Sequence, residues 1–206
     1  MHQEPTAHLI DPHSGAMAGA TGCYEKRLKD LAGLYLDDDA FRAAVAGGGD
    51  GIVYSVQEMR PKQTVGDLIF GTTFMQPGRI GDEYYMTRGH IHAVANRPEV
   101  YYGENGTGLM LLESPEGETR ILEVTPRVAA YVPPMWIHRS VNTGSVPLVM
   151  SFFYPSESGQ DYGIIERSGG MATLIVADGA GWKAVPNPRY RQRAPEEVAR
   201  VLATQK

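Results

Sequence analysis

Short apolar runs, each followed by residues that favour turns, recur from Gly51 almost to the end of the chain. They are rich in Val, Ile, Leu, Tyr and Phe, and each is long enough for a strand but too short for a typical helix. The runs lie at residues 52–56, 68–74, 100–102, 109–112, 121–124, 128–132, 148–154, 172–176 and 182–185. Turn formers such as Gln76-Pro77-Gly78 separate them. This pattern predicts an all-β fold with a closed or double-sheet antiparallel architecture, such as a jelly roll.

The composition favours one domain with extensions at both ends. Of the 206 residues, 42% are hydrophobic and 21% are charged, so there is enough apolar material for a sizeable core. The 24 glycines and 14 prolines mostly interrupt the apolar runs, as expected for strands joined by turns. We divide the chain into an N-terminal arm with helices at 1–50, a barrel domain at 51–188 and a C-terminal tail at 189–206.

Helical patterns precede the first strand. Residues 1–22 have no hydrophobic period and are expected to form an extended arm. Between Tyr24 and Ala46, apolar residues are spaced three and four apart, which is a helical period. The three aspartates at 37–39 can cap a short helix there, and the glycines at 47–49 are expected to end it.

A second helical pattern lies at the C-terminus. Pro195 is followed by two glutamates, which favours a helix start, and apolar residues at 198, 201 and 202 form one side. The arginines at 189, 191 and 193 come just before it, and we expect them to lie in a solvated tail.

Charge and cysteine content exclude several classes of protein. The formal net charge is −5 and no long run of Lys or Arg occurs, so nucleic acid is not expected as a partner. Cys23 is the only cysteine, which excludes a disulfide-stapled secreted fold. Neither an apolar signal region nor an 18-residue apolar stretch is present, so no membrane association is predicted. The cytoplasm is therefore the expected compartment.

The residues with the clearest chemistry are His90, His92, Glu99 and His138. Side chains two apart in a strand project to the same face, so His90 and His92 can bind one ion side by side. The residues between His92 and Glu99 are enough for a turn, after which Glu99 opens the next strand. Three imidazoles and a carboxylate suit a borderline divalent ion and would leave two positions open if the ion is octahedral. The histidines at 2, 8 and 13 lie in the arm and are not expected to be ligands.

These residues resemble the two motifs of the cupin superfamily. Gly106 follows the first motif, and Pro133, His138 and Asn142 keep the spacing of the second. The chain departs from the family at Tyr84, Arg127 and Met135, where many cupins carry glycine. The longer interval from His92 to Glu99, with the segments 81–92, 131–139, 154–155 and 161–163, resembles the cupin-type glucose-6-phosphate isomerases over about residues 54–188.

The resemblance implies a jelly-roll homodimer that interconverts glucose 6-phosphate and fructose 6-phosphate in glycolysis and gluconeogenesis. It implies that His90, His92, Glu99 and His138 bind one divalent transition-metal ion per subunit, Fe²⁺ before Mn²⁺, Ni²⁺, Co²⁺ or Zn²⁺. It further implies catalytic roles for Glu99 and His138. The residues it places around the sugar phosphate are Tyr54, Thr73, Thr87, Gly89, Tyr101, Tyr154, Gln160 and Tyr162.

Gln160 replaces a histidine that the family usually has before its Asp-Tyr-Gly segment. Glutamine can hydrogen-bond a sugar hydroxyl but cannot transfer a proton at neutral pH. Glu99 is the candidate base for a route through a cis-enediol, although a metal-bound carboxylate is a weak base. A metal-assisted hydride shift avoids that objection, and both routes stay open.

Three other functions are compatible with the same ligands. An Fe(II)-dependent cupin dioxygenase would use all four but favours an apolar or aromatic pocket. A sugar isomerase of different specificity, one that also accepts mannose 6-phosphate for example, would differ only in pocket detail. A non-enzymatic sugar-binding cupin would have no need of intact metal ligands.

Overall fold

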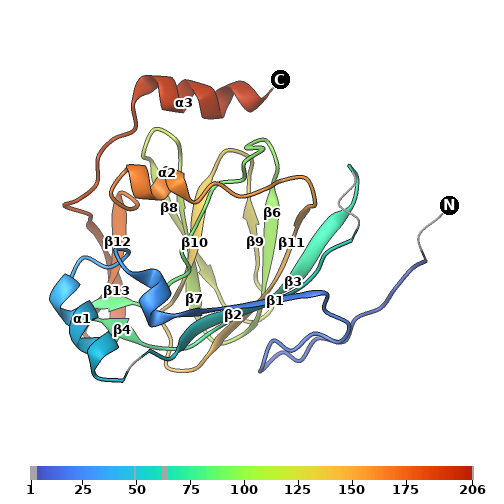
Figure 1. Ribbon diagram of the computed structural model, residues 1–206, viewed down its shortest axis with the longest axis horizontal. Helices are drawn as coiled ribbons and strands as arrows, with labels where there is room; N and C mark the ends of the chain where they lie inside the picture. The colour runs from blue at the N-terminus through green and yellow to red at the C-terminus, as the bar shows by residue number, and fades with distance from the viewer. Residues whose placement is uncertain (1–3, 49, 62–64, 206) are drawn as a thin grey trace.

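The computed structural model describes residues 4–48, 50–61 and 65–205, so His2 and Gly49 lie outside the described residues. Strands dominate and enclose a barrel; the helices lie before β2, between β11 and β12, and after β13 (Figure 1). The strands are β1 (Gly22–Arg27), β2 (Ile52–Met59), β3 (Leu68–Met75), β4 (Arg79–Ile80), β5 (Glu83–Tyr84), β6 (Glu99–Asn105), β7 (Gly108–Glu113), β8 (Thr119–Val124), β9 (Ala129–Val132), β10 (Ile137–Asn142), β11 (Leu148–Pro155), β12 (Thr173–Asp178) and β13 (Gly181–Pro186). The helices are η1 (Leu28–Leu31), α1 (Asp38–Ala46), α2 (Gly163–Arg167), α3 (Pro195–Leu202) and η2 (Ala203–Gln205).

Three antiparallel sheets make up the barrel. The largest has the order β1-β2-β3-β11-β6-β9, and it faces smaller sheets of order β10-β7-β8 and β13-β12-β5-β4. Strand β11 lies between β3 and β6 although it is far from both in sequence, which is the crossover expected of a jelly roll. The predicted all-β fold with short helices towards both ends of the chain is confirmed. No helix in the described part of the chain is long and apolar enough to cross a membrane.

The core fills the space between the sheets. Strands β7 and β10 are buried at every position, and residues from β3 and β11 such as Met75, Leu148 and Met150 are fully buried against them. All nine predicted apolar runs lie in strands, with bounds that differ by a few residues. The sequence Ile137–Asn142 was not predicted as a strand because polar side chains dominate it, and burial of both faces is decided only by the sheets around it.

The prediction of helix from Tyr24 onward is wrong for its first residues. Gly22–Arg27 is strand β1, which pairs with β2 in a register that sets Tyr24 opposite Val56. Hydrogen bonds offered by the edge of β2 outweigh the weak helical preference of this segment. The helix itself is confirmed at α1, where the Asp37 side chain accepts a hydrogen bond from the Ala40 backbone, as predicted for its N-cap.

The extended arm is a packed element. Gly15 and Met17 are buried, the Thr72 hydroxyl of β3 donates to the Gly15 carbonyl, and the Met17 backbone donates to Gln57 at 2.9 Å. The arm therefore covers the outer face of β2 and β3, the sheet face opposite the barrel interior. The division of a single domain into an arm, a barrel and a tail at residues 50 and 188 stays a prediction.

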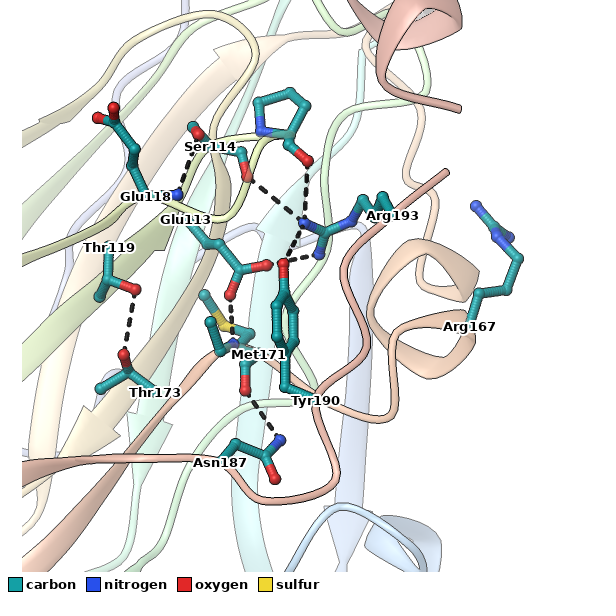
Figure 2. Close-up of polar contacts among 12 residues, drawn as sticks. Glu113, Ser114, Glu118, Thr119, Arg167, Met171, Thr173, Asn187, Tyr190 and Arg193 are labelled. Atoms are coloured by element: carbon teal, nitrogen blue, oxygen red, sulfur yellow. Dashed lines mark hydrogen bonds and ion pairs between the residues drawn. The ribbon is translucent and has the colours of Figure 1, made fainter. Parts of the chain in front are cut away.

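The tail that leads to α3 is anchored by a buried ion pair (Figure 2). Arg193 Nη2 lies 2.6 Å from Glu113 Oε1, and both side chains are 0% exposed. The guanidinium also lies over the ring of Tyr190, at 6.0 Å. The prediction of a solvated tail is thus wrong for Arg193, which reaches into the barrel because Glu113 at the end of β7 supplies a buried opposite charge. Arg189 is exposed but pairs with Asp38 at 2.7 Å.

We predict that Glu113→Gln lowers the free energy of unfolding by about 3 kcal/mol, because it leaves the Arg193 charge buried without a counter-ion. Urea unfolding at neutral pH measures the loss. The double variant Glu113→Leu/Arg193→Met should regain most of it, since an apolar pair carries no charge to desolvate. Arg191→Met is the matched control on the exposed side of the same tail and should change stability little. A single variant as stable as the wild type would contradict a structural role for the pair.

Two of the departures from the cupin pattern have a left-handed backbone. Arg127 (φ 76°) and Met135 (φ 73°) are the non-glycine residues with positive φ in the described segments. This conformation costs a residue with a side chain roughly 1–2 kcal/mol, which explains why glycine is common at both positions in the family. The turns are therefore retained at the expense of local strain.

We predict that Arg127→Gly keeps or raises stability, by up to about 1 kcal/mol, because relief of strain offsets the greater freedom of glycine in the unfolded chain. Arg120→Gly on the exposed side of β8 is the control and should lose about 0.5–1 kcal/mol, as glycine does in a strand. Thermal unfolding compares the two. Equal losses would show that the left-handed turn at 127 is not strained.

Candidate functional site

One cavity opens on the inner face of the six-stranded sheet. Its walls come from six strands, β1, β2, β3, β6, β10 and β11, and from the segments 87–90 and 160–162. Alternate residues of a strand share a face, and on β2 the side chains of Tyr54, Val56 and Glu58 all point inward. Strands β6 and β11 of the same sheet also contribute alternate residues, and β3 contributes Thr73. The cavity therefore results directly from period-two alternation in the sheet.

A glycine makes room at the centre of this wall. Gly71 lies between Glu58 and Phe152 in one row across β2, β3 and β11. A Cβ atom there would lie 2.8 Å from the Phe152 ring, closer than carbon atoms approach without displacement. The row thus packs the Phe152 ring against the backbone at Gly71, and a larger residue there would displace the ring or the neighbouring strand β2.

Four potential ligands converge at the inner end of the cavity. His90, His92, Glu99 and His138 are all buried, and one donor atom of each lies within 4.8 Å of the others. Glu99 Oε2 lies 3.0 Å from His138 Nε2, 3.2 Å from His92 Nε2 and 3.9 Å from His90 Nε2. The structure thus brings together the whole predicted set, in an arrangement that could bind one ion.

The local structure of the His-x-His segment differs from the prediction. His90 and Ile91 form isolated bridges, His90 with His138 and Ile91 with Asp161, and are not part of a regular strand. Pairing with a different partner at each residue keeps the backbone extended, so both imidazoles still point the same way. Gly89 before them has φ 75°, and a Cβ there would lie 2.9 Å from the His138 carbonyl oxygen. Glycine is therefore needed at position 89 for His90 to form its backbone bridge with His138.

The hydrogen bonds of two imidazoles indicate that a cation belongs between the ligands. His92 Nδ1 lies 2.8 Å from the Arg97 carbonyl and His138 Nδ1 lies 3.1 Å from the Trp136 carbonyl. Carbonyls only accept, so each Nδ1 carries the hydrogen, and each neutral ring directs the lone pair of Nε2 at Glu99. A lone pair facing a carboxylate oxygen at 3.0 Å requires a proton or a metal ion between them. Within the described residues, buried His90 Nε2 and His92 Nε2 also have no hydrogen-bond partner.

The protonation states fit metal binding as well. Burial holds the pKa of His90 well below its ordinary value, with a further contribution from the neighbouring His138 imidazole. Burial alone would raise the pKa of Glu99, but contacts with His138 and His92 outweigh it and leave that pKa well below the ordinary value. Neutral imidazole and ionised carboxylate are the forms that bind metal ions.

All of the predicted substrate-side residues line the cavity: Tyr54, Thr73, Thr87, Gly89, Tyr101, Tyr154, Gln160 and Tyr162. The Tyr162 hydroxyl donates to the Gln160 side chain, which holds the amide at the cavity wall. Burial raises the pKa of Tyr54 to about 12, so its hydroxyl stays protonated and able to donate. Their contact with a substrate stays a prediction.

Among the wall residues that sequence reasoning missed are Tyr24, Glu58 and Arg60. Tyr24 was assigned to a helix. Glu58 and Arg60 continue the alternation of Tyr54 and Val56 beyond the end of the apolar run, and extending that period would have found them. Arg88, which also lines the cavity, forms an ion pair with Glu166 and lies over the Tyr162 ring at 5.1 Å.

Comparison with known proteins identifies the family. The family model described as glucose-6-phosphate isomerase (GPI) matches residues 25–192. The glucose-6-phosphate isomerase of Sinorhizobium medicae (strain WSM419) is 55% identical over 204 residues, which is 98% of this chain and 95% of that protein. The chain belongs to the glucose-6-phosphate isomerase family. The identically named protein of Pyrococcus horikoshii is 39% identical over 93% of this chain and its own full length.

Likeness among solved structures is more remote. An oxalate oxidase in complex with the substrate analogue glycolate aligns with a TM-score of 0.45 and 14% identity, over 53% of this chain and 55% of that chain. Family membership therefore follows from the sequence matches, and the β-rich fold from the strands themselves.

We predict that chelator-stripped protein binds one divalent ion per chain and is stabilised by it, by about 2.7 kcal/mol when free ion is 100-fold above its dissociation constant. Thermal unfolding with added Co²⁺, together with the visible spectrum of the ion, measures this. His92→Ala should lose both signals, whereas His13→Ala, in the exposed arm, should keep them. Binding that survives His92→Ala would place the ion elsewhere.

Proposed function

We propose that this chain is a metal-dependent aldose–ketose isomerase that interconverts glucose 6-phosphate and fructose 6-phosphate, and so acts in glycolysis and gluconeogenesis. One observation carries the proposal: the three imidazoles and Glu99 converge at the inner end of a cavity whose walls are rich in hydroxyl groups. Relatives bearing this name, matched over nearly the full chain, support the choice of substrate.

The residues that would hold the ion are His90, His92, Glu99 and His138, with Fe²⁺ as the proposed ion ahead of Mn²⁺, Ni²⁺, Co²⁺ or Zn²⁺. Mixed nitrogen and oxygen ligands of this kind suit borderline divalent ions. When bound, such an ion supplies Lewis-acid chemistry, polarising the sugar carbonyl and stabilising negative charge on its oxygens.

The remaining chemistry falls to the side chains. Glu99 is buried and ionised, and can remove a proton from one carbon and return it to the next in a route through a cis-enediol. His138 Nε2 lies 3.0 Å from Glu99 Oε2, so the two side chains would share the ion and His138 would help to fix the position of Glu99. Tyr101, buried beside the ligands, keeps its proton and can donate to a sugar oxygen, since burial and Glu99 raise its pKa well above the ordinary value. The hydride shift stays the alternative route.

Gln160 has a positioning role in this proposal. Its amide oxygen accepts from Tyr162, which leaves the amide nitrogen to donate to a sugar hydroxyl. Gln160 cannot exchange a proton at neutral pH. A ring-opening or proton-transfer step that needs an acid or a base must therefore use another side chain.

The alternatives are weaker. A dioxygenase favours an apolar pocket, whereas threonine and tyrosine hydroxyls and arginines line this one. A purely sugar-binding cupin has no need of four converging ligands. We further propose a homodimer in the cytoplasm. Exposed aromatic side chains on three neighbouring strands of the sheet, Tyr102, Tyr131 and Phe153, support an interface on its outer face.

We predict that chelator-stripped protein does not convert fructose 6-phosphate and that one added divalent ion restores turnover. A coupled assay for glucose 6-phosphate, run with each ion in turn, measures this. His138→Ala and Glu99→Ala should each lower kcat by at least about a hundredfold, since a ligand and a base are removed. Glu99→Gln removes the carboxylate charge but keeps the side-chain volume. His13→Ala is the control and should not change kcat.

Unchanged turnover after stripping, or in either alanine variant with the barrel intact by circular dichroism, would contradict the mechanism. Oxygen consumption without isomerisation would favour the dioxygenase. Substrate deuterated at C2 separates the two routes: full retention in the product argues against the enediol, and loss to solvent argues against the hydride shift. A parallel assay with mannose 6-phosphate tests specificity.

A further inference from the structure

Three guanidinium groups line the cavity, and they differ in the protein groups to which they already donate. Arg139 is 4% exposed and donates to the Arg88 carbonyl at 2.7 Å and to Met86 Sδ at 2.9 Å, so it holds the backbone around the site. Arg88 pairs with Glu166 outside the barrel and covers the Tyr162 ring. Arg60, at the end of β2, is the cation on the opposite wall.

Arg60 is held rigidly but is still accessible. Its Nε and Nη2 donate to the two carboxylate oxygens of Glu58, a paired geometry that fixes the plane of the guanidinium. The Arg60 side chain is 39% exposed, whereas that of Glu58 is only 7% exposed. Glu58 therefore occupies one edge of the guanidinium from the buried side, and the remaining edge is left for solvent or a ligand.

Arg60 also lies near the hydroxyls predicted to surround the phosphate. Tyr154 is inward-facing on β11, and the positive charge of Arg60 opposes the rise that burial causes in the pKa of Tyr154. The positive charges of Arg88 and Arg60 likewise oppose the rise that burial causes in the pKa of Tyr162. Arg60, Tyr154 and Tyr162 all line this one cavity, and the Arg88 guanidinium lies over the Tyr162 ring.

We infer that Arg60, oriented by Glu58, binds the phosphate of the substrate and determines the preference of this site for a phosphorylated sugar. The inference rests on the proposed function. The hydroxyls of Thr73, Thr87, Tyr154 and Tyr162 are neutral donors. A phosphate dianion that leaves water needs opposite charge as well as hydrogen bonds, and a planar guanidinium matches its oxygens.

The carboxylate of Glu58 makes the inference testable, because it has the opposite electrostatic effect. It sits behind Arg60 and repels an incoming dianion, while its hydrogen bonds hold the guanidinium in place. If the Glu58–Arg60 pair only stabilised the fold, removing either partner would change substrate affinity in the same direction. If Arg60 binds phosphate, removing Arg60 weakens the affinity whereas removing the Glu58 charge strengthens it.

The experiment compares Arg60→Gln with Glu58→Gln in metal-loaded protein. Arg60→Gln should raise the KM for fructose 6-phosphate by at least about tenfold with little change in kcat, and should weaken calorimetric binding of inorganic phosphate by a similar factor. Glu58→Gln should tighten both affinities, because it removes a negative charge and keeps one acceptor for Arg60. Arg60→Lys should restore part of the loss.

Binding of unphosphorylated fructose should not change in any variant, and Arg79→Gln, an exposed arginine outside the cavity, is the control. Equal weakening in both glutamine variants, or an unchanged KM and phosphate affinity in Arg60→Gln, would overturn the inference. An inactive wild type would contradict the proposed function alone, since phosphate calorimetry still decides the role of Arg60.

Discussion

The site depends on one electrostatic constraint: the Nε2 lone pairs of His92 and His138, the Nε2 atom of His90 and a carboxylate face one another in the buried interior of a barrel. Glu99 Oε2 lies within 3.9 Å of Nε2 of all three histidines, and backbone carbonyls fix the rings of His92 and His138 with their hydrogens pointing away. Such an arrangement is unfavourable without positive charge at its centre. The fold holds these groups together because a cation can make them compatible.

The scaffold meets this constraint by bringing distant segments together. His90 and His138 are joined by a backbone bridge between a loop and β10, and Glu99 opens β6 in the facing sheet. Glycines at 71 and 89 provide the close approaches that no side chain would tolerate. Arg127 and Met135 adopt the left-handed turns next to β9 and β10 without being glycine. Backbone geometry is thus maintained at these turns despite changes in sequence.

Most of the barrel could be predicted because strand signals are local. Alternation and turn residues identify β2, β3, β6 and β11 without knowledge of their partners. Elements defined by their neighbours could not be predicted. β1 forms because the edge of β2 was free, and β10 is a strand because both of its faces are covered. The same reason explains why the burial of Arg193 could not be predicted: its charge is buried next to that of Glu113, which lies far away in the sequence at the end of β7.

The sequence by itself determined the type of fold, the ligand set and the kind of chemistry, because residue type and short-range spacing carry that information. Only the tertiary structure decided that the four ligands share one centre, that the His-x-His segment is held by two separate bridges, and that Glu58 and Arg60 face the cavity. Those facts depend on contacts between residues far apart in the chain. Local preferences do not encode such contacts, since each arises only when sheets pack and exclude water.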